Sequence, residues 1–569
     1  MIRKVTPRGC GIFLGLVFFF ADFSAAATKP NLVLITLDSV RADRTGFLGS
    51  KVSATPNLDR LAERSLVFEH AYSQAPSSVV SHATILSGAY PQSTGMLEIG
   101  GALLHTLPYL PDLLKAQGYR TAAFVSSIDL DPRNGLAQGF NRGFENYDAG
   151  FSPAIPGDAH TPITERSPAL TLERANAWLD RSAHGPLPLF LWVHLGNTRA
   201  SGESYNSAVT SSDAAIGKLI SVLQKLKIYD NTAVLVVAAH GESLGAHGEE
   251  THGIFLYDET IHVPLLVKLP DSNAAGKSPS NHVNAKARLV DIAPSLLEIA
   301  AIPVPSQMPG QSLIRIAKSA GDQPAYSRSD LPHRGFGWSP LESWRAGKYL
   351  YIRAPKPELY DLTADPAATH NLAQTSKATL DTMAAQLESF DKRFNGEAGK
   401  STAELSSSEM QKLASLGYIG LQKSSTSAAA VTGTDPKDKI AVANKVIAAT
   451  STGDQSKPDH TIAALSPLLS ADPNLFLAQY AIGVALARQA KYSAAIEHLH
   501  KAIELQPDAA WAHYEIGASL LKTADFKTAI VHLEIATQRL PEFAPAHTAL
   551  ADAYEHTGRS EHAKKERRK

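Results

Sequence analysis

The stretch that most constrains the fold covers residues 234–266, where an apolar strand leads into a polar loop and a second apolar run follows. The loop concentrates histidine and glutamate side chains, namely His240, Glu242, His247, Glu249, Glu250 and His252. Open α/β sheets bind ligands at the carboxyl ends of their strands, and clustered imidazoles and carboxylates are the usual material of metal and acid–base sites. We therefore expect the functional site at this loop, with a merely solvated polar loop as the alternative.

Other apolar runs indicate that this strand belongs to a large sheet. Residues 31–37 form a continuous apolar run that ends at Asp38, and such runs suit parallel strands covered on both faces. A carboxylate at the end of such a strand faces the ligand crevice, although Asp38 could also cap a following helix. Further strands are expected at 118–125 and 188–195, helices at 56–64, 110–117, 215–226 and 290–300, and a smaller terminal sheet at 344–353 and 358–362. The alternation predicts a doubly wound α/β sheet.

Residues 75–88 combine a helix start with a candidate nucleophile. Ser77 or Ser78 is expected to cap a helix that Gly88 ends, and the first turn would present backbone N–H groups to an anion. Ser78 and His82 are four residues apart, so they share one helical face. Since a hydroxyl nucleophile needs a neighbouring base or a metal, Ser78 and His82 are candidate catalytic residues. A plain helix cap is the alternative.

The first residues predict an export signal. Arg3, Lys4 and Arg8 precede an apolar run at 12–20, and small residues at 25–27 offer a cleavage site. We expect removal of residues 1–27, no membrane span afterwards, and a periplasmic or secreted protein. An uncleaved anchor is the alternative, but the apolar run is shorter than the roughly 20 residues that cross a bilayer. The single cysteine, Cys10, lies inside this segment, which leaves the mature chain without a disulfide or thiolate ligand.

Charge and composition indicate an ordinary globular protein and argue against general nucleic-acid binding. The 569 residues allow several domains, and 44% hydrophobic with 19% charged residues is ordinary globular composition. The 54 Lys and Arg residues nearly balance the 55 Asp and Glu residues, so no general attraction to nucleic acid is implied.

The C-terminal part of the chain repeats itself. Small residues and prolines recur at intervals of 34 residues: Pro473, Pro507 and Pro541; Ala478, Ala512 and Ala546; Ala495, Ala529 and Ala563. This period is the tetratricopeptide signature, and it predicts stacked helix pairs that bind a protein partner. A role in dimerisation or rigidity is the alternative. Residues 437–469 are expected to form a degenerate leading pair, and the histidines of the array are expected to be polar helix-face residues rather than metal ligands.

Taken together, several ordered motifs make the chain resemble the sulfatase family of the alkaline-phosphatase-like superfamily. They are NLVLITLDSVRAD (31–43), SHATILSG (81–88), GYRTAAF (118–124), HGESLGAHGEETHG (240–253), VPLL (263–266), LVDIAPSLLEIA (289–300) and ELYDLTADP (358–366). The resemblance implies hydrolysis of sulfuric esters, or phosphoric esters by relation, with a divalent cation, Ca²⁺ or Mg²⁺. It places Asp38 and His240 as metal ligands, Ser78 as nucleophile and His252 as a basic residue near the ester.

The same motifs depart from the family pattern at the site. Ala239 stands where a second metal carboxylate is expected, and Ser39 stands where another would follow Asp38. Val80 and His82 do not match the signature that converts a residue to formylglycine, so no formylglycine is expected. Basic residues expected after the GYRTA strand fall on Ser126 and Ile128, and residues 196–198 replace an expected Asp-Pro-His.

These departures leave two functions open. The chain is either a sulfuric ester hydrolase of arylsulfatase type with a depleted site, or an inactive pseudo-sulfatase that binds an anionic ligand and recruits a partner. We expect weak cation binding, because a hard cation usually takes six or more oxygen ligands. A Zn²⁺ site remodelled from His240, His247, His252 and Glu249 is a further alternative.

The expected order of domains is a signal at 1–27, a sulfatase-like domain at 30–375, a helical connector and flexible linker at 376–434, and a tetratricopeptide-repeat domain at 435–569.

Overall fold

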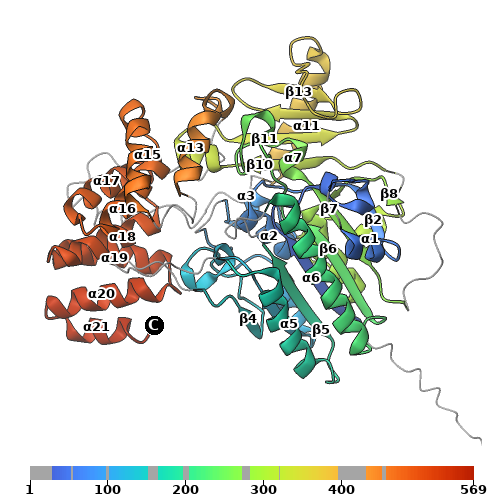
Figure 1. Ribbon diagram of the computed structural model, residues 1–569, viewed down its shortest axis with the longest axis horizontal. Helices are drawn as coiled ribbons and strands as arrows, with labels where there is room; N and C mark the ends of the chain where they lie inside the picture. Colours follow the sequence, from blue (N-terminus) through green and yellow to red (C-terminus); the bar gives the residue numbers. More distant parts are fainter. Residues whose placement is uncertain are drawn as a thin grey trace, which may run out of the picture.

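A computed structural model describes residues 29–52, 55–97, 101–151, 165–196, 204–271, 282–319, 321–394, 431–450 and 457–569 (Figure 1). The expected signal at 1–27 and most of the expected linker lie outside these ranges. Among the helices of the described residues, none has both the length and the apolar character that crossing a membrane requires.

The larger sheet has the order β4-β3-β5-β1-β6-β7-β2-β8, with β9 paired to β2. The central strand β1 is parallel to both neighbours, β5 and β6, whereas β7 runs antiparallel to β6. The sheet is therefore mixed, and it belongs to the α/β class that the sequence predicts. Its strands are β1 Asn31–Leu37, β2 Leu66–Tyr72, β3 Arg120–Phe124, β4 Asn146–Asp148, β5 Leu189–Leu195, β6 Thr232–Ala238, β7 His262–Lys268, β8 His282–Val283 and β9 Ala287–Arg288.

Helices cover both faces of this sheet (Figure 1). One layer holds α1, α5 and α6, and another holds α2, α4 and α8. This arrangement explains why β1, β5 and β6 are apolar at nearly every position, since both sides of each strand face packed helices. The helices of this part are α1 Pro56–Ala62, α2 Ser78–Ser87, α3 Pro91–Thr94, α4 Leu110–Ala116, α5 Pro168–Ser182, α6 Tyr205–Lys225, α7 Asp258–Ile261, α8 Ile292–Ile299, α9 Leu313–Ile316 and α10 Leu331–Phe336.

The helix expected near Ser78 is present as α2. It begins at Ser78, and Gly88 ends it in the left-handed conformation, with φ of 62°. Ser77 occupies the N-cap position, but its side chain makes no capping hydrogen bond. The first turn of α2 therefore keeps N–H groups that no serine side chain caps.

A second sheet has the order β10-β11-β12-β13 and is antiparallel throughout. The segment 344–353, expected as one strand, is a hairpin that turns at Gly347. Helix α11, Lys377–Phe394, packs on this sheet through Phe390, whose ring contacts Tyr326 and Trp344. The contacts of this subdomain thus reach Phe394, beyond the expected boundary at 375. Its strands are β10 Ala325–Ser329, β11 Leu341–Ala346, β12 Tyr349–Arg353 and β13 Glu358–Asp361.

The C-terminal part is a series of antiparallel helix pairs, as the 34-residue period predicts (Figure 1). At Gly483 and Gly517 an added Cβ atom would lie 2.6 and 2.5 Å from Leu499 and Leu533, so these close helix contacts require glycine. The helices are α13 Ile440–Thr450, α15 Pro458–Ala471, α16 Phe476–Arg488, α17 Tyr492–Leu505, α18 Ala510–Lys522, α19 Phe526–Arg539, α20 Ala544–His556 and α21 Ser560–Glu566. The leading pair expected at 437–469 corresponds to α13 and α15.

Three histidines of this array differ from the expectation of polar helix-face residues. His513, His532 and His547 are buried between paired helices. His513 pairs with His532, with 3.0 Å between their Nδ1 atoms, and His547 pairs with Glu566 at 2.6 Å. His513 also donates from Nε2 to the carbonyl of Pro507, and His547 donates from Nε2 to the carbonyl of Pro541. Each of these prolines opens the repeat that contains the histidine. The histidines are buried because each links the turn and the second helix of its own repeat.

Candidate functional site

The candidate site lies at the carboxyl ends of the three central strands, beside the start of α2. Asp38 directly follows β1, His194 lies near the end of β5, and His240 follows β6 by two residues. The register aligns these ends, because Leu37 pairs with Leu195 on one side and with Ala238 on the other. The strand geometry therefore brings together residues that are about 200 positions apart in the chain.

Asp38 is held between two imidazoles. Its Oδ1 lies 3.2 Å from His240 Nε2, and its Oδ2 lies 3.4 Å from His194 Nε2. Burial by itself would raise the pKa of the Asp38 carboxyl, but the hydrogen bonds and charges of His194 and His240 hold that pKa well below its usual range. Asp38 is therefore ionised at neutral pH.

His194 is a site residue that the sequence analysis did not identify. Its Nδ1 accepts the backbone N–H of Ser126 at 3.3 Å, so the ring proton of the neutral form resides on Nε2, which faces Asp38. The hydroxyl of Ser126 lies 3.1 Å from the same Nδ1 and accepts the N–H of Gly196. The sequence feature that could have identified it is that His194 is the one histidine in the otherwise apolar strand 189–195.

His240 and His252 lie beside each other on the loop after β6, with their rings tilted rather than stacked. Their ring centroids are 4.3 Å apart, and His252 Nδ1 lies 3.1 Å from Glu242 Oε2. His240 Nδ1 donates to the Gly241 carbonyl at 2.8 Å. Burial lowers the pKa of His240, but the Asp38 carboxylate outweighs it and raises that pKa above the ordinary value. His252 keeps 35% of its side chain exposed and is accessible to a ligand.

Ser78 and His82 lie together at the start of α2, but the imidazole is already engaged. His82 Nδ1 is 2.7 Å from the Ser78 carbonyl, which can only accept, so Nδ1 carries the proton. Nε2 then accepts from the Thr36 hydroxyl at 2.9 Å. In this tautomer His82 has no free lone pair for the Ser78 hydroxyl, 3.4 Å away. Burial lowers the pKa of His82 to about 3, so it stays neutral.

A further acidic group lies close to these residues. Asp129, in the short helix Ile128–Leu130 after β3, is affected electrostatically by Asp38, His194 and His252. Burial and the Asp38 charge raise the pKa of Asp129 to about 6.

The residues at the site do not fit the hard divalent cation that the resemblance implies. Both oxygens of Asp38 face imidazole nitrogens, and Ala239 presents a buried methyl group where a carboxylate would be needed. Within the described ranges, no group of three or more His, Cys, Asp or Glu side chains is placed to hold a metal ion.

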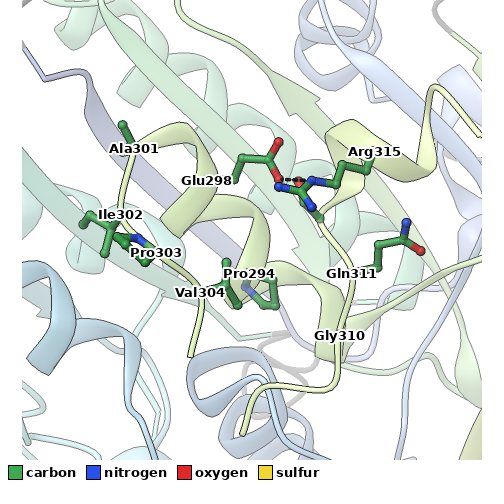
Figure 2. Close-up of a pocket in the computed structure, with 10 residues that line it drawn as sticks. Pro294, Glu298, Ala301, Ile302, Pro303, Val304, Gly310, Gln311 and Arg315 are labelled. Atoms are coloured by element: carbon green, nitrogen blue, oxygen red, sulfur yellow. Dashed lines mark hydrogen bonds and ion pairs between the residues drawn. The ribbon is translucent and has the colours of Figure 1, made fainter. Parts of the chain in front are cut away.

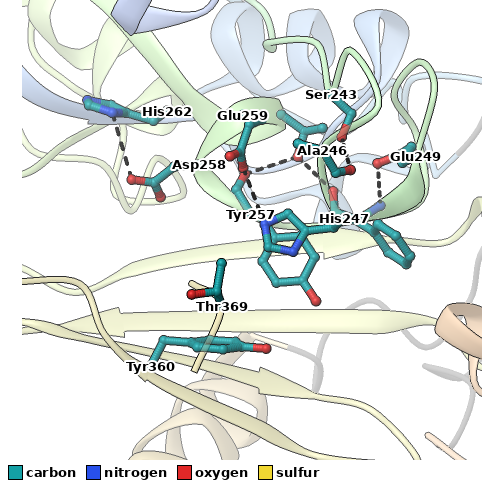
Figure 3. A network of polar contacts seen from close by, with 12 residues as sticks. Ser243, Ala246, His247, Glu249, Tyr257, Asp258, Glu259, His262, Tyr360 and Thr369 are labelled. Atoms are coloured by element: carbon teal, nitrogen blue, oxygen red, sulfur yellow. Dashed lines mark hydrogen bonds and ion pairs between the residues drawn. The ribbon is translucent and has the colours of Figure 1, made fainter. Parts of the chain in front are cut away.

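The remodelled Zn²⁺ site is not formed either. His247 stacks on Tyr257 with 3.6 Å between ring centroids, and Glu249 accepts backbone N–H groups from Ile254 and Phe255 (Figure 3). His252 pairs with Glu242 instead. The loop folds these side chains into separate contacts, so His240, His247, His252 and Glu249 do not converge.

The structure also contains a pocket of about 500 Å³ along α8 and α9 (Figure 2). Its wall includes Pro294, Ile302 and an ion pair between Glu298 and Arg315. It contains none of the site residues described above, so it has no part in the candidate site.

Comparisons with known proteins agree with this architecture. The sulfatase family matches residues 30–302, the C-terminal region of N-sulphoglucosamine sulphohydrolase matches 251–393, and a TPR repeat matches 488–523. The chain is 28% identical over 407 residues to an ulvan-active sulfatase of Formosa agariphila, covering 61% of this chain and 77% of that protein. It is 24% identical over 426 residues to a delta 4,5-hexuronate-2-O-sulfatase of Bacteroides thetaiotaomicron, covering 62% and 86%.

Among solved structures, the phosphonate monoester hydrolase of Agrobacterium radiobacter superposes with a TM-score of 0.53 at 18% identity, covering 64% of this chain and 96% of that one. This likeness concerns the fold. With the ordered motifs, the mixed sheet and the family matches in agreement, the α/β part of this chain belongs to the sulfatase family and is followed by tetratricopeptide repeats.

Proposed function

We propose that this protein hydrolyses a sulfuric ester slowly, at the carboxyl ends of β1, β5 and β6. The observation that carries the proposal is the convergence of Asp38, His194, His240 and His252 beside the start of α2. Folding brings these groups together from distant segments, and the relatives named above are sulfatases. Phosphoric esters are a related substrate class.

Each group has a proposed task. The N–H groups and the positive dipole end of α2 would hold the anionic ester, and the exposed edge of His252 would contact its oxygens. The Ser78 hydroxyl would attack sulfur, the ester S–O bond would break, and the hydroxyl proton would pass to the departing alcohol. Water would then attack the sulfate ester on Ser78, which releases hydrogen sulfate and restores the hydroxyl. Asp38 and His194 would orient His240. We assign no step to a metal ion, because the donors do not fit one.

The expected turnover is slow for a reason that the geometry supplies. A serine nucleophile needs a base, and the neighbouring imidazole of His82 already donates from Nδ1 to the Ser78 carbonyl. General-base assistance typically contributes about 10²–10⁴-fold to a rate. Wild-type turnover should therefore lie roughly that far below the turnover of a sulfatase with an activated nucleophile.

Turnover of aryl sulfates and aryl phosphates tests this proposal. Ser78→Ala should abolish turnover, whereas Ser77→Ala should preserve it, because the Ser77 side chain makes no capping hydrogen bond. Equal activity of the two variants would show that Ser78 is not the nucleophile.

The second candidate function is binding without turnover. The engaged Nδ1 of His82 and the two imidazoles that face the Asp38 carboxylate favour it. Calorimetric titration with inorganic sulfate distinguishes the two functions. Binding that requires His252, together with no hydrolysis of any ester tested, would favour an anion-binding scaffold whose repeats recruit a protein partner.

Two features outside the site complete the proposal. The repeats would bind a protein partner, as a tetratricopeptide array implies. The signal-like residues 1–27 would direct export to the periplasm or the medium. Fractionation of cells that express the full chain, and N-terminal sequencing of the product, would test the second point.

A further inference from the structure

The repeat array is seated against the loop that carries His252. The side chain of Asn444, on α13, donates from Nδ2 to the Gly248 carbonyl at 2.8 Å and accepts the Glu250 N–H on Oδ1 at 3.2 Å. One amide side chain thus pairs with two backbone groups at the tip of the loop, much as a neighbouring strand would. A Cβ atom added at Gly248 would lie 3.4 Å from Ile440, so α13 also packs on this tip.

Contacts within the loop anchor much of it but leave the outermost backbone groups of its tip to α13. Ser243 N–H donates to the Thr251 carbonyl, and Gly245 N–H donates to the Glu249 carbonyl, which folds the loop back on itself. The outward-facing groups at Gly248 and Glu250 are the ones that Asn444 holds. His252 is two residues further on, and its ring contacts the ring of His240.

Other contacts keep the array in place. Arg334, on α10, pairs with Asp508 of the array at 3.1 Å, and Asn141, in the loop after β3, donates to Glu542 at 3.1 Å. A Cβ atom added at Gly135 would lie 2.8 Å from Leu540. The array therefore touches both loops that border the candidate site, after β3 and after β6.

We propose that Asn444 is a positioning residue of the candidate site: by holding residues 248–250 it fixes the backbone that presents His252. The repeat array then supports a loop of the site as well as offering a surface for a partner. This inference rests on the proposed function only where it concerns turnover, since the hold on the loop can be measured without any substrate.

The experiment compares variants of the full chain. Asn444→Ala removes both hydrogen bonds, whereas Asn444→Asp keeps an acceptor for the Glu250 N–H. Lys445→Ala is the matched control, because Lys445 is exposed on the same helix. Amide hydrogen exchange across residues 248–252 is measured together with kcat and KM for an aryl sulfate and with the melting temperature of the array.

We expect exchange at Glu250 to rise about tenfold in Asn444→Ala, the factor that a lost hydrogen bond of about 1.4 kcal/mol represents, and to stay near wild type in Asn444→Asp and Lys445→Ala. KM should rise while the melting temperature stays unchanged, with partial rescue by Asp. Unchanged exchange in Asn444→Ala would overturn the inference. Faster exchange in a protein that hydrolyses no ester would support the loop contact and refute the proposed hydrolysis separately.

Discussion

Restoring a carboxylate at Ala239 tests whether the site is a cation cradle that has lost a single ligand. Leu37 pairs with Ala238, and Ala239 N–H donates to the Leu37 carbonyl, so Asp38 and Ala239 are neighbours on adjacent strands. Adjacent strands lie about 4.8 Å apart, so a carboxylate in Ala239→Asp should lie roughly 5 Å from that of Asp38. At an effective dielectric constant of about 20 their repulsion costs about 3 kcal/mol.

We therefore expect Ala239→Asp to lower the free energy of unfolding by about 3 kcal/mol in chelator, with the charge of His240 offsetting part of this cost. Free Ca²⁺ at about 100 times its Kd should return about 2.7 kcal/mol. Denaturant unfolding with and without Ca²⁺ measures both effects, and Ala239→Asn is the uncharged control. If Ca²⁺ stabilises Ala239→Asp no more than it stabilises the control, the reasoning is refuted, and the site has diverged by more than one side chain.

Three further predictions concern Glu249, His532 and Tyr205. Burial raises the pKa of Glu249 from 4.5 to about 8, so the folded chain retains a proton that the unfolded chain loses. The free energy of unfolding should therefore fall as pH rises from about 4.5 through 8, and urea titrations at several pH values should show that Glu249→Gln removes this pH dependence. Burial and neighbouring imidazoles lower the pKa of His532, so the array should lose stability as pH falls below about 6.5. This loss should be smaller in His513→Gln, which removes one of those imidazoles, and circular dichroism melts at several pH values would measure it. Tyr205→Phe removes a hydroxyl that donates to the carbonyl of Ser39, the residue that follows Asp38, so it should lower the free energy of unfolding by about 1 kcal/mol and reduce turnover. An unchanged melting temperature and unchanged kinetics would contradict a role of Tyr205 in holding this backbone.

Much of the fold could be predicted from the sequence because the determining signals are local. The continuous apolar runs at 31–37 and 234–237 require strands covered on both faces, and β1 and β6 are central strands. The 34-residue period requires stacked helix pairs, because each pair buries its apolar face only on the next. The hairpin at Gly347 was not predicted, although the Gly347-Lys348 pair that separates its two strands is a turn signal.

The histidine-rich loop shows where local patterns stop being informative. Its spacing predicted a possible ligand cluster, but tertiary contacts separate the members, with His247 on Tyr257 and Glu249 on backbone N–H groups. Residue types within a loop do not determine which neighbour each side chain meets. That choice depends on packing against segments that are distant in sequence.

The sequence by itself determined the strands, the repeat period, the family and the absence of a carboxylate at Ala239, since each is visible in residue identity and spacing. Only the tertiary structure decided that His194 joins Asp38, because their contact depends on the register of β1 and β5, which are 156 residues apart at these positions. It also decided that α13 holds the loop of His252. Such contacts arise from the three-dimensional arrangement of strands and helices, which no spacing along the chain records.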